Sequence, residues 1–174
     1  LTVVENPTTS STGMAFLAST VGRFGENKWL QFWQALKDND VKIASGWEDA
    51  YYTHFSGSAG KGNYPIVLSY SSSPADEQNT AAILEGCFRQ TEYAAVLKGA
   101  KNSAGAVKLV NWLLSKSFQE SLPGAMYVSP VIEGVVLPES WATKAPSARS
   151  FFGEGLDINS NRQSWLRSWS DLFG

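Results

Sequence analysis

Three short segments of this chain combine hydroxyl and aromatic side chains in a pattern that could bind a small ligand. They are residues 4–13 (VENPTTSSTG), 46–51 (GWEDAY) and 68–75 (LSYSSSPA). Each places its hydroxyls or an aromatic ring where a predicted strand ends or a predicted helix begins. Open α/β sheets hold small ligands at such places. The three segments therefore predict one binding site that is assembled from loops.

The first segment carries five consecutive hydroxyl residues, from Thr8 to Thr12, directly before Gly13. A helix predicted to begin here would present free backbone N–H groups, which favour an anion or a polar ligand. Ser and Thr are also preferred N-cap residues, so any one of these hydroxyls could serve the helix alone. Five in a row exceed what one cap requires. Ser10 and Ser11 are the candidates for ligand contact, and the capping alternative stays open.

The other two segments supply aromatic rings. Trp47 follows Gly46 directly after a predicted strand, and a tryptophan there could stack on an aromatic or cationic ring. Tyr70 ends another predicted strand, where side chains project towards a cleft. The alternatives are a Trp that belongs to the core and a strand end followed by a serine turn. The serines of that turn are Ser71, Ser72 and Ser73.

Catalytic and metal sites find little support. His54 is the only histidine and Cys87 the only cysteine, so neither a zinc cluster nor an internal disulfide is indicated. Glu85 and Glu92 lie seven residues apart in a predicted strand and would face opposite sides. The glycine-rich stretch 57–62 lacks the Gly-Lys-Ser/Thr ending of a phosphate-binding loop. The sequence predicts no enzyme, no metal site and no cofactor.

Composition limits the class of protein. The 174 residues fit one domain, and 43% hydrophobic residues suffice for a packed core. A formal net charge of −2 without charged blocks argues against nucleic acid and against a polybasic membrane anchor. The uninterrupted apolar runs are far shorter than the roughly 20 residues that span a bilayer.

Hydrophobic periodicity predicts an α/β fold. A helix should carry Met14, Leu17 and Val21 inward and end at Gly25, and Asn27 should cap the next helix. Short valine-rich stretches between 123 and 138 should anchor a loop. We expect strands at 1–6, 41–44, a buried one at 65–70 and one or two over 88–97, with helices at about 14–24, 28–37, 47–55, 103–114 and 160–173 and a short helical turn at 118.

Segments 6–13, 46–51 and 68–75, in this order and spacing, resemble the thiamine-binding periplasmic proteins of bacterial ABC importers. These belong to the two-lobed receptors of the iron and spermidine type. The similarity continues through later segments, so it covers nearly the whole chain. Those segments are residues 90–92 (QTE), 118–123 (FQESLP) and 162–165 (RQSW), with Trp169.

The resemblance implies ligand contacts at the candidates already named: Ser10, Ser11, Trp47, Tyr70, Ser71, Ser72 and Ser73. Two positions depart from the family. Asp76 stands where the family has an aromatic residue, and Tyr127 stands where it has a second tryptophan. Stacking would be weaker or rearranged, although Asp76 could pair with a cationic, thiazolium-like ring.

The resemblance also implies an architecture: a lobe like those of type II periplasmic binding proteins, with a central sheet flanked by helices and a helical C-terminal portion. The chain would be the C-terminal half of the receptor, with 1–92 in the second lobe and 93–174 returning to a first lobe absent from this chain. Helix 160–173 and parts of 103–121 would then lose their usual partner. They would repack within the chain, dimerise, or belong to a larger protein.

The implied function is extracytoplasmic, in the periplasm or as a cell-surface lipoprotein. The chain opens at Leu1 without a methionine or signal peptide, so we expect a targeting segment upstream. Two lobes would close by a hinge around thiamine or a related vitamin-like cation and present it to an ABC permease. The alternatives are a receptor for another small solute and a non-catalytic interaction or regulatory domain that reuses the fold.

Overall fold

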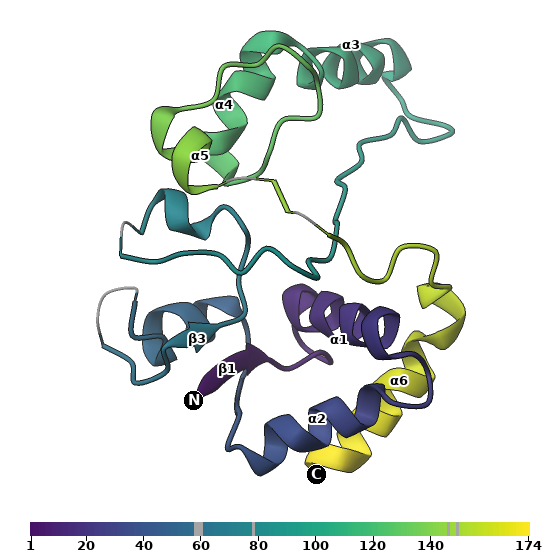
Figure 1. The fold of residues 1–174 in the computed structure, drawn as a ribbon. Helices are drawn as coiled ribbons and strands as arrows, with labels where there is room; N and C mark the ends of the chain where they lie inside the picture. The colour runs from purple at the N-terminus through teal and green to yellow at the C-terminus, as the bar shows by residue number, and fades with distance from the viewer. Residues whose placement is uncertain (58–60, 78, 146, 149) are drawn as a thin grey trace. The chain divides into compact units, whose positions relative to one another are not determined.

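The computed structural model describes residues 1–57, 61–77, 79–145, 147–148 and 150–174. They form two compact units (Figure 1). Unit 1 comprises Leu1–Ser71, Ala82–Arg89 and Ser147–Gly174, and unit 2 comprises Ser72–Ala81 and Gln90–Pro146. The predicted mixture of strands and helices is confirmed. The predicted assignment of 1–92 and 93–174 to two lobes of a larger receptor stays a prediction.

A small parallel sheet lies in unit 1, in the order β2-β1-β3. Its strands are β1 (Thr2–Glu5), β2 (Lys42–Ala44) and β3 (Ile66–Val67). Glu5 pairs with Ala44 on one side of β1, and Val3 pairs with Val67 on the other. The strands predicted at 1–6 and 41–44 are confirmed.

The prediction of a buried strand over 65–70 is wrong in length and burial. β3 has only two residues, and Ile66 is 48% exposed. β3 is an edge strand with a strand neighbour on one side only. The residues after it continue as irregular chain towards Tyr70.

Two helices follow β1. In α1 (Ser11–Phe24) the Ser10 side chain accepts a hydrogen bond from the Gly13 N–H, and Gly25 ends the helix at φ 76°. A positive φ is readily adopted by glycine, which explains the predicted stop. Helix α2 (Trp29–Asp38) has Lys28 at its N-cap with no side-chain hydrogen bond, so the predicted cap at Asn27 is wrong.

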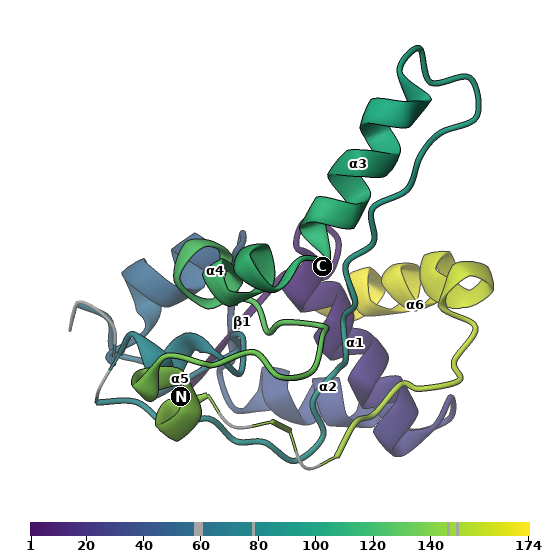
Figure 2. The same cartoon turned by 90° about the horizontal axis from the view of Figure 1, so that it is seen from above.

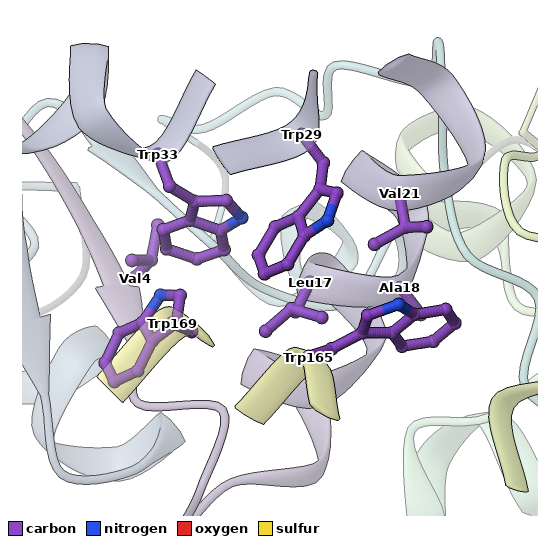
Figure 3. Close-up of a cluster of buried hydrophobic side chains, with 8 residues drawn as sticks. All are labelled: Val4, Leu17, Ala18, Val21, Trp29, Trp33, Trp165 and Trp169. Carbon is purple, nitrogen blue, oxygen red and sulfur yellow. The ribbon is translucent and has the colours of Figure 1, made fainter. Parts of the chain in front are cut away.

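The C-terminal helix α6 (Ile158–Phe173) packs within unit 1 and completes a tryptophan-rich core. Trp33 of α2 and Trp169 of α6 meet edge to face, with ring centroids 5.8 Å apart. Figure 3 shows these two rings together with side chains from α1 and β1. Helix α6 therefore has a packing partner within the chain, and dimerisation or membership of a larger protein stays a prediction. The buried members of the core are Val4, Leu17, Ala18, Val21, Trp29, Trp33, Trp165 and Trp169.

The third predicted helix is present as a short π-helix, η1 (Asp49–His54), which follows β2. Its Ala50 and Tyr51 are buried, as the predicted apolar face requires. A π-helix has one more residue per hydrogen-bonded turn than an α-helix and is frequently found at functional sites. Here it begins two residues after the predicted ligand residue Trp47.

Unit 2 contains four helical elements and, among its described residues, no named strand. They are η2 (Ser73–Ala75), α3 (Ser103–Leu113), α4 (Lys116–Met126) and α5 (Glu139–Lys144). Trp141 of α5 is 3% exposed, and α5 packs against η2. None of the described helices in either unit combines the length and hydropathy needed to cross a bilayer.

Several predictions for unit 2 are wrong. Residues 88–97 form no strand, and Tyr93 is 90% exposed. Helix α3 is capped by Asn102, buries no residue and points away from the other helices of its unit (Figure 2). The turn predicted at 118 is the full helix α4, which continues through Pro123. The valine-rich stretches expected to anchor a loop between 123 and 138 are not buried, since Val131 and Val136 are exposed. Periodicity signals an apolar face but not whether a partner covers it.

The tryptophan core should carry much of the stability of unit 1. We expect Trp169→Ala to lower the free energy of unfolding by about 3–5 kcal/mol, because it empties a fully packed site. Urea unfolding followed by far-ultraviolet circular dichroism measures this. Trp112→Ala is the matched control, since Trp112 is 53% exposed in α3, and it should cost less than about 1.5 kcal/mol. Equal losses in the two variants would contradict the assignment of Trp169 to the core.

Candidate ligand-binding site

The three strands of the sheet bring the loops of unit 1 to one edge. Because the strands are parallel, the segments that follow their carboxyl ends emerge on the same side. The segment 6–10 follows β1, Ser45 to Trp47 follow β2, and Leu68 to Ser71 follow β3. The chain leaves β1 for β2 on one side and later returns to β3 on the other. Such a switch in direction is where open α/β sheets bind ligands.

Most hydroxyls of the first loop already have structural partners. The Thr8 hydroxyl donates to the Asn6 side chain at 2.6 Å, and the Thr9 hydroxyl donates to the Ser45 carbonyl at 2.8 Å. The latter bond ties the loop after β1 to the loop after β2. Ser10 caps the helix, so its hydroxyl has a structural role, and ligand contact by Ser10 stays a prediction. Ser11 is exposed, and its hydroxyl has no hydrogen-bond partner among the described residues.

Trp47 lies in an aromatic cluster, here defined as Trp47, Tyr51, Tyr52 and Tyr70. The indole stacks on Tyr51 with centroids 4.8 Å apart at 18°, and Tyr70 lies 5.8 Å away at 51°. The indole N–H donates to the Ser69 hydroxyl at 2.8 Å. Trp47 is half-buried, whereas Tyr52 and Tyr70 are about half exposed. Trp47 and Tyr70 are thus neighbours at a partly open surface, and Tyr51 covers one face of the indole.

The remaining predicted site residues belong to unit 2, apart from Ser71, which is exposed in unit 1. The Ser72 hydroxyl is buried and donates to the Tyr127 backbone carbonyl at 2.9 Å. Ser73 begins η2, and exposed Asp76 ends it. Tyr127 has a positive φ of 57° and is 55% exposed. Within unit 2, Ser72 therefore fixes the backbone at Tyr127. A single site formed by all nine residues stays a prediction.

Asp49 holds the segment that carries Trp47. Its carboxylate accepts hydrogen bonds from the Ser45 backbone N–H at 3.1 Å and the Ser45 hydroxyl at 3.2 Å. The backbone bond from Ser45 is the main reason that the pKa of Asp49 lies below its usual value, with a smaller contribution from His54. His54 lies 3.5 Å from this carboxylate. The single histidine therefore has a structural neighbour rather than a nucleophile.

The reactive groups do not converge. Burial is the main cause that raises the pKa of the Cys87 thiol, which disfavours the nucleophilic thiolate. Across residues 1–57, 61–77, 79–145, 147–148 and 150–174 there is no group of three or more His, Cys, Asp or Glu that could hold a metal ion.

Two surface hollows lie apart from the aromatic cluster. One, of about 660 Å³, is lined by α6 residues such as Arg162 and Leu166. The other, of about 260 Å³, is lined by Asn6, Thr8 and the end of α6. Neither is lined by Trp47 or Tyr70. The hollows therefore do not coincide with the aromatic cluster. The exposed tyrosines at the carboxyl edge of the sheet are the stronger candidates for ligand contact, because they offer specific contacts for a ring.

One feature of the site has no counterpart in the sequence predictions. Glu5, the last residue of β1, is fully buried, and burial raises its pKa to about 7 despite a hydrogen bond from Thr12. Its Oε1 atom has no hydrogen-bond partner among the described residues. An acidic residue inside the apolar run before Pro7 was the available signal. Perturbed carboxylates of this kind are concentrated at functional sites.

The raised pKa makes stability depend on pH. The folded protein keeps the Glu5 proton up to about pH 7, whereas the unfolded chain loses it near 4.5, so stability falls as pH rises through this window. The free energy of unfolding of Glu5→Gln should therefore rise relative to that of the parent, by up to about 3 kcal/mol between pH 4.5 and pH 8. Urea unfolding across this range measures the gain. Glu154→Gln, at an exposed carboxylate, should show no such trend, and a flat Glu5→Gln difference would contradict the raised pKa.

Comparison with known proteins places the chain in a family. A family model described as bacterial extracellular solute-binding protein matches residues 1–157. The thiamine-binding periplasmic proteins of Salmonella typhimurium and Escherichia coli are 30% and 29% identical to this chain over 175 residues, and that of Haemophilus influenzae is 28% identical. Each alignment covers 96% of this chain and 51% of the relative, so the chain spans about half their length. The chain therefore belongs to the bacterial extracellular solute-binding protein family.

Proposed function

We propose that this chain forms part of the extracytoplasmic solute-binding component of an ABC importer, and that its ligand is thiamine or a related cationic, aromatic molecule. The observation that carries the proposal is the pairing of Trp47 with Tyr70 at the carboxyl edge of the sheet. The names of the aligned relatives support the choice of thiamine. Membership in a solute-binding family supports the prediction that the chain is not an enzyme.

The aromatic cluster suits a ring that carries a positive charge. Cation–π contacts with tryptophan or tyrosine contribute about 0.5–2 kcal/mol each, depending on how well water is excluded. The exposed surfaces of Tyr52 and Tyr70 are available for such contacts. Tyr51 stacks on the indole of Trp47, so a ligand ring approaches the cluster from its open side. Ionised Asp49, two residues after Trp47, adds a negative charge that favours a cation.

Hydroxyl groups supply the polar contacts in this proposal. In unit 1 these are Ser10, Ser11 and Ser71, at the ends of the segments that follow β1 and β3. In unit 2 the proposal retains Ser73, Asp76 and Tyr127 as further contacts. Ser72 supports the Tyr127 backbone through its hydroxyl, so its contribution is to position that residue.

The proposed receptor has two lobes that close around the ligand, with residues 1–92 in one lobe and 93–174 returning to the other. A first lobe beyond this chain and a membrane permease are its partners in this proposal. The coverage of only about half of each relative supports a further lobe. A periplasmic or cell-surface location is proposed on the basis of the family and the relatives.

Calorimetric titration of the full-length protein with thiamine tests the proposal. We expect saturable binding that Trp47→Ala weakens about tenfold or more, since it removes the ring contacts with Tyr51, Tyr52 and Tyr70 and the bond to Ser69. Trp47→Phe keeps a ring and should lose less. Trp112→Ala, which removes an exposed tryptophan of α3, is the matched control and should bind as the parent does.

The outcomes separate the alternatives. A folded protein that gives no heat with millimolar thiamine would rule out the thiamine assignment. Binding of spermidine instead, still sensitive to Trp47→Ala, would indicate a receptor for a different cation. Thiamine binding that is unaffected by Trp47→Ala would move the site away from the aromatic cluster.

A further inference from the structure

A chain of hydrogen bonds leads from a buried acid to the ligand loop. The Thr12 hydroxyl donates to the Glu5 carboxylate. The Thr12 and Ser10 hydroxyl oxygens lie 2.8 Å apart, and the Ser10 oxygen accepts from the Gly13 N–H at 3.3 Å. Glu5 and Thr12 are buried, and Ser10 is half-buried at the mouth of α1. The chain therefore connects the interior of unit 1 with a residue of the proposed binding site.

No described residue forms an ion pair with Glu5 that would fix its charge. The elements that pack against β1 are α1, β2, β3 and η1, and α2 and α6 join them in the core around Val4. Their charged or titratable side chains are Arg23, Lys37, Asp38, Lys42, Asp49, Tyr51, Tyr52, His54, Arg162, Arg167 and Asp171. None of these is among the causes of the shifted pKa of Glu5, which are burial, the Thr12 hydroxyl and its own backbone. The charge of Glu5 is thus controlled by pH near neutrality.

The state of Glu5 determines which way the hydroxyls point. A hydroxyl has one proton to donate. When Glu5 is ionised, the Thr12 hydroxyl donates its hydrogen bond to the carboxylate, so the Ser10 hydroxyl must donate to the Thr12 oxygen. The Ser10 oxygen already receives the Gly13 N–H, and its remaining lone pair can only accept from a ligand.

Protonation of Glu5 reverses this order. A proton on Oε2 has the Thr12 oxygen as its acceptor, whereas a proton on Oε1 would be a buried donor without a partner among the described residues. Buried donors without partners are rarer than buried acceptors without them, so Oε2 is favoured. Thr12 then donates to Ser10, and the Ser10 proton becomes free to donate to a ligand.

We propose that Glu5 is a positioning residue whose ionisation, relayed through Thr12, sets whether the Ser10 hydroxyl accepts or donates a hydrogen bond at the ligand loop. This inference rests on the proposed function for its biological role, but the relay itself does not. Ionised Glu5 selects ligands that bring N–H or O–H donors and positive charge to Ser10. Neutral Glu5 selects ligands that bring an acceptor.

The relay can be tested without ligand by nuclear magnetic resonance on the full-length protein. The chemical shift of the Glu5 side-chain carboxyl carbon should change with pH with a midpoint near 7, and the chemical shift of the Gly13 amide should change with the same midpoint. In Thr12→Val, which keeps the shape and removes the hydroxyl, Glu5 should still titrate and the Gly13 amide should not follow it. Thr20→Val, the same change at another buried threonine of α1, is the control and should leave the coupling intact.

The consequence for binding is tested by calorimetry with thiamine at pH 6 and pH 8. We expect the affinity of the parent to rise about three- to tenfold over this range, the effect of one hydrogen bond gained. The rise should be lost in Glu5→Gln and in Thr12→Val and kept in Thr20→Val. Persistence of the rise in Thr12→Val would overturn the relay in favour of the Glu5 charge acting alone.

The two experiments distinguish the two proposals. If the Gly13 amide follows Glu5 but thiamine does not bind at either pH, the relay stands and the proposed function fails. If thiamine binds with the same affinity at both pH values, or the Gly13 amide does not follow Glu5, the relay is overturned and the proposed function is unaffected. Should Glu5→Gln fail to fold, Thr12→Val gives the same decision.

Discussion

The parallel pairing of β1 with both β2 and β3 is the constraint on which the rest of unit 1 depends. Parallel strands send their carboxyl ends to one edge, so the serine-rich loop, the Trp47 segment and the Tyr70 segment must emerge together. The bond from Thr9 to the Ser45 carbonyl and the bond from Trp47 to Ser69 join neighbouring segments at this edge. The sheet is small, but it determines which side chains can share a site.

The tryptophan core gives this edge a rigid support. Val4 of β1 packs with Leu17 of α1 and with Trp33 and Trp169, so strand and helices share one buried cluster. Helix α6 is the last element in the chain, and it packs on α2, far from it in sequence. Against this apolar packing, Glu5 is a costly exception, since it buries a carboxyl of which one oxygen has no partner among the residues that the structure describes. A cost of that kind is retained more readily where the group has a role in binding.

Prediction from sequence succeeded where local and long-range signals agreed. Gly25 ends α1 as expected, and the tryptophans of residues 160–173 are buried as their spacing required. It failed in unit 2, where the apolar periodicity of α3 matches a helix that buries no residue. The loop predicted between 123 and 138 begins later than expected, because Pro123 lies inside α4. Hydrophobic periodicity indicates which face of a segment is apolar, whereas the burial of that face depends on a partner elsewhere in the chain.

For the candidate site, the residue types follow directly from the sequence: serines at a helix mouth, and Trp47 and Tyr70 after strands. Their neighbours depend on how the folded chain packs. Tyr51 covers one face of the indole, and Ser72 is committed to the Tyr127 carbonyl. The burial of Glu5 was likewise invisible in sequence, because the pKa of a carboxyl depends on the water and the donors around it, which the packing of β1 against its neighbours supplies. Residue type fixes which interactions are possible, and the fold fixes which of them are made.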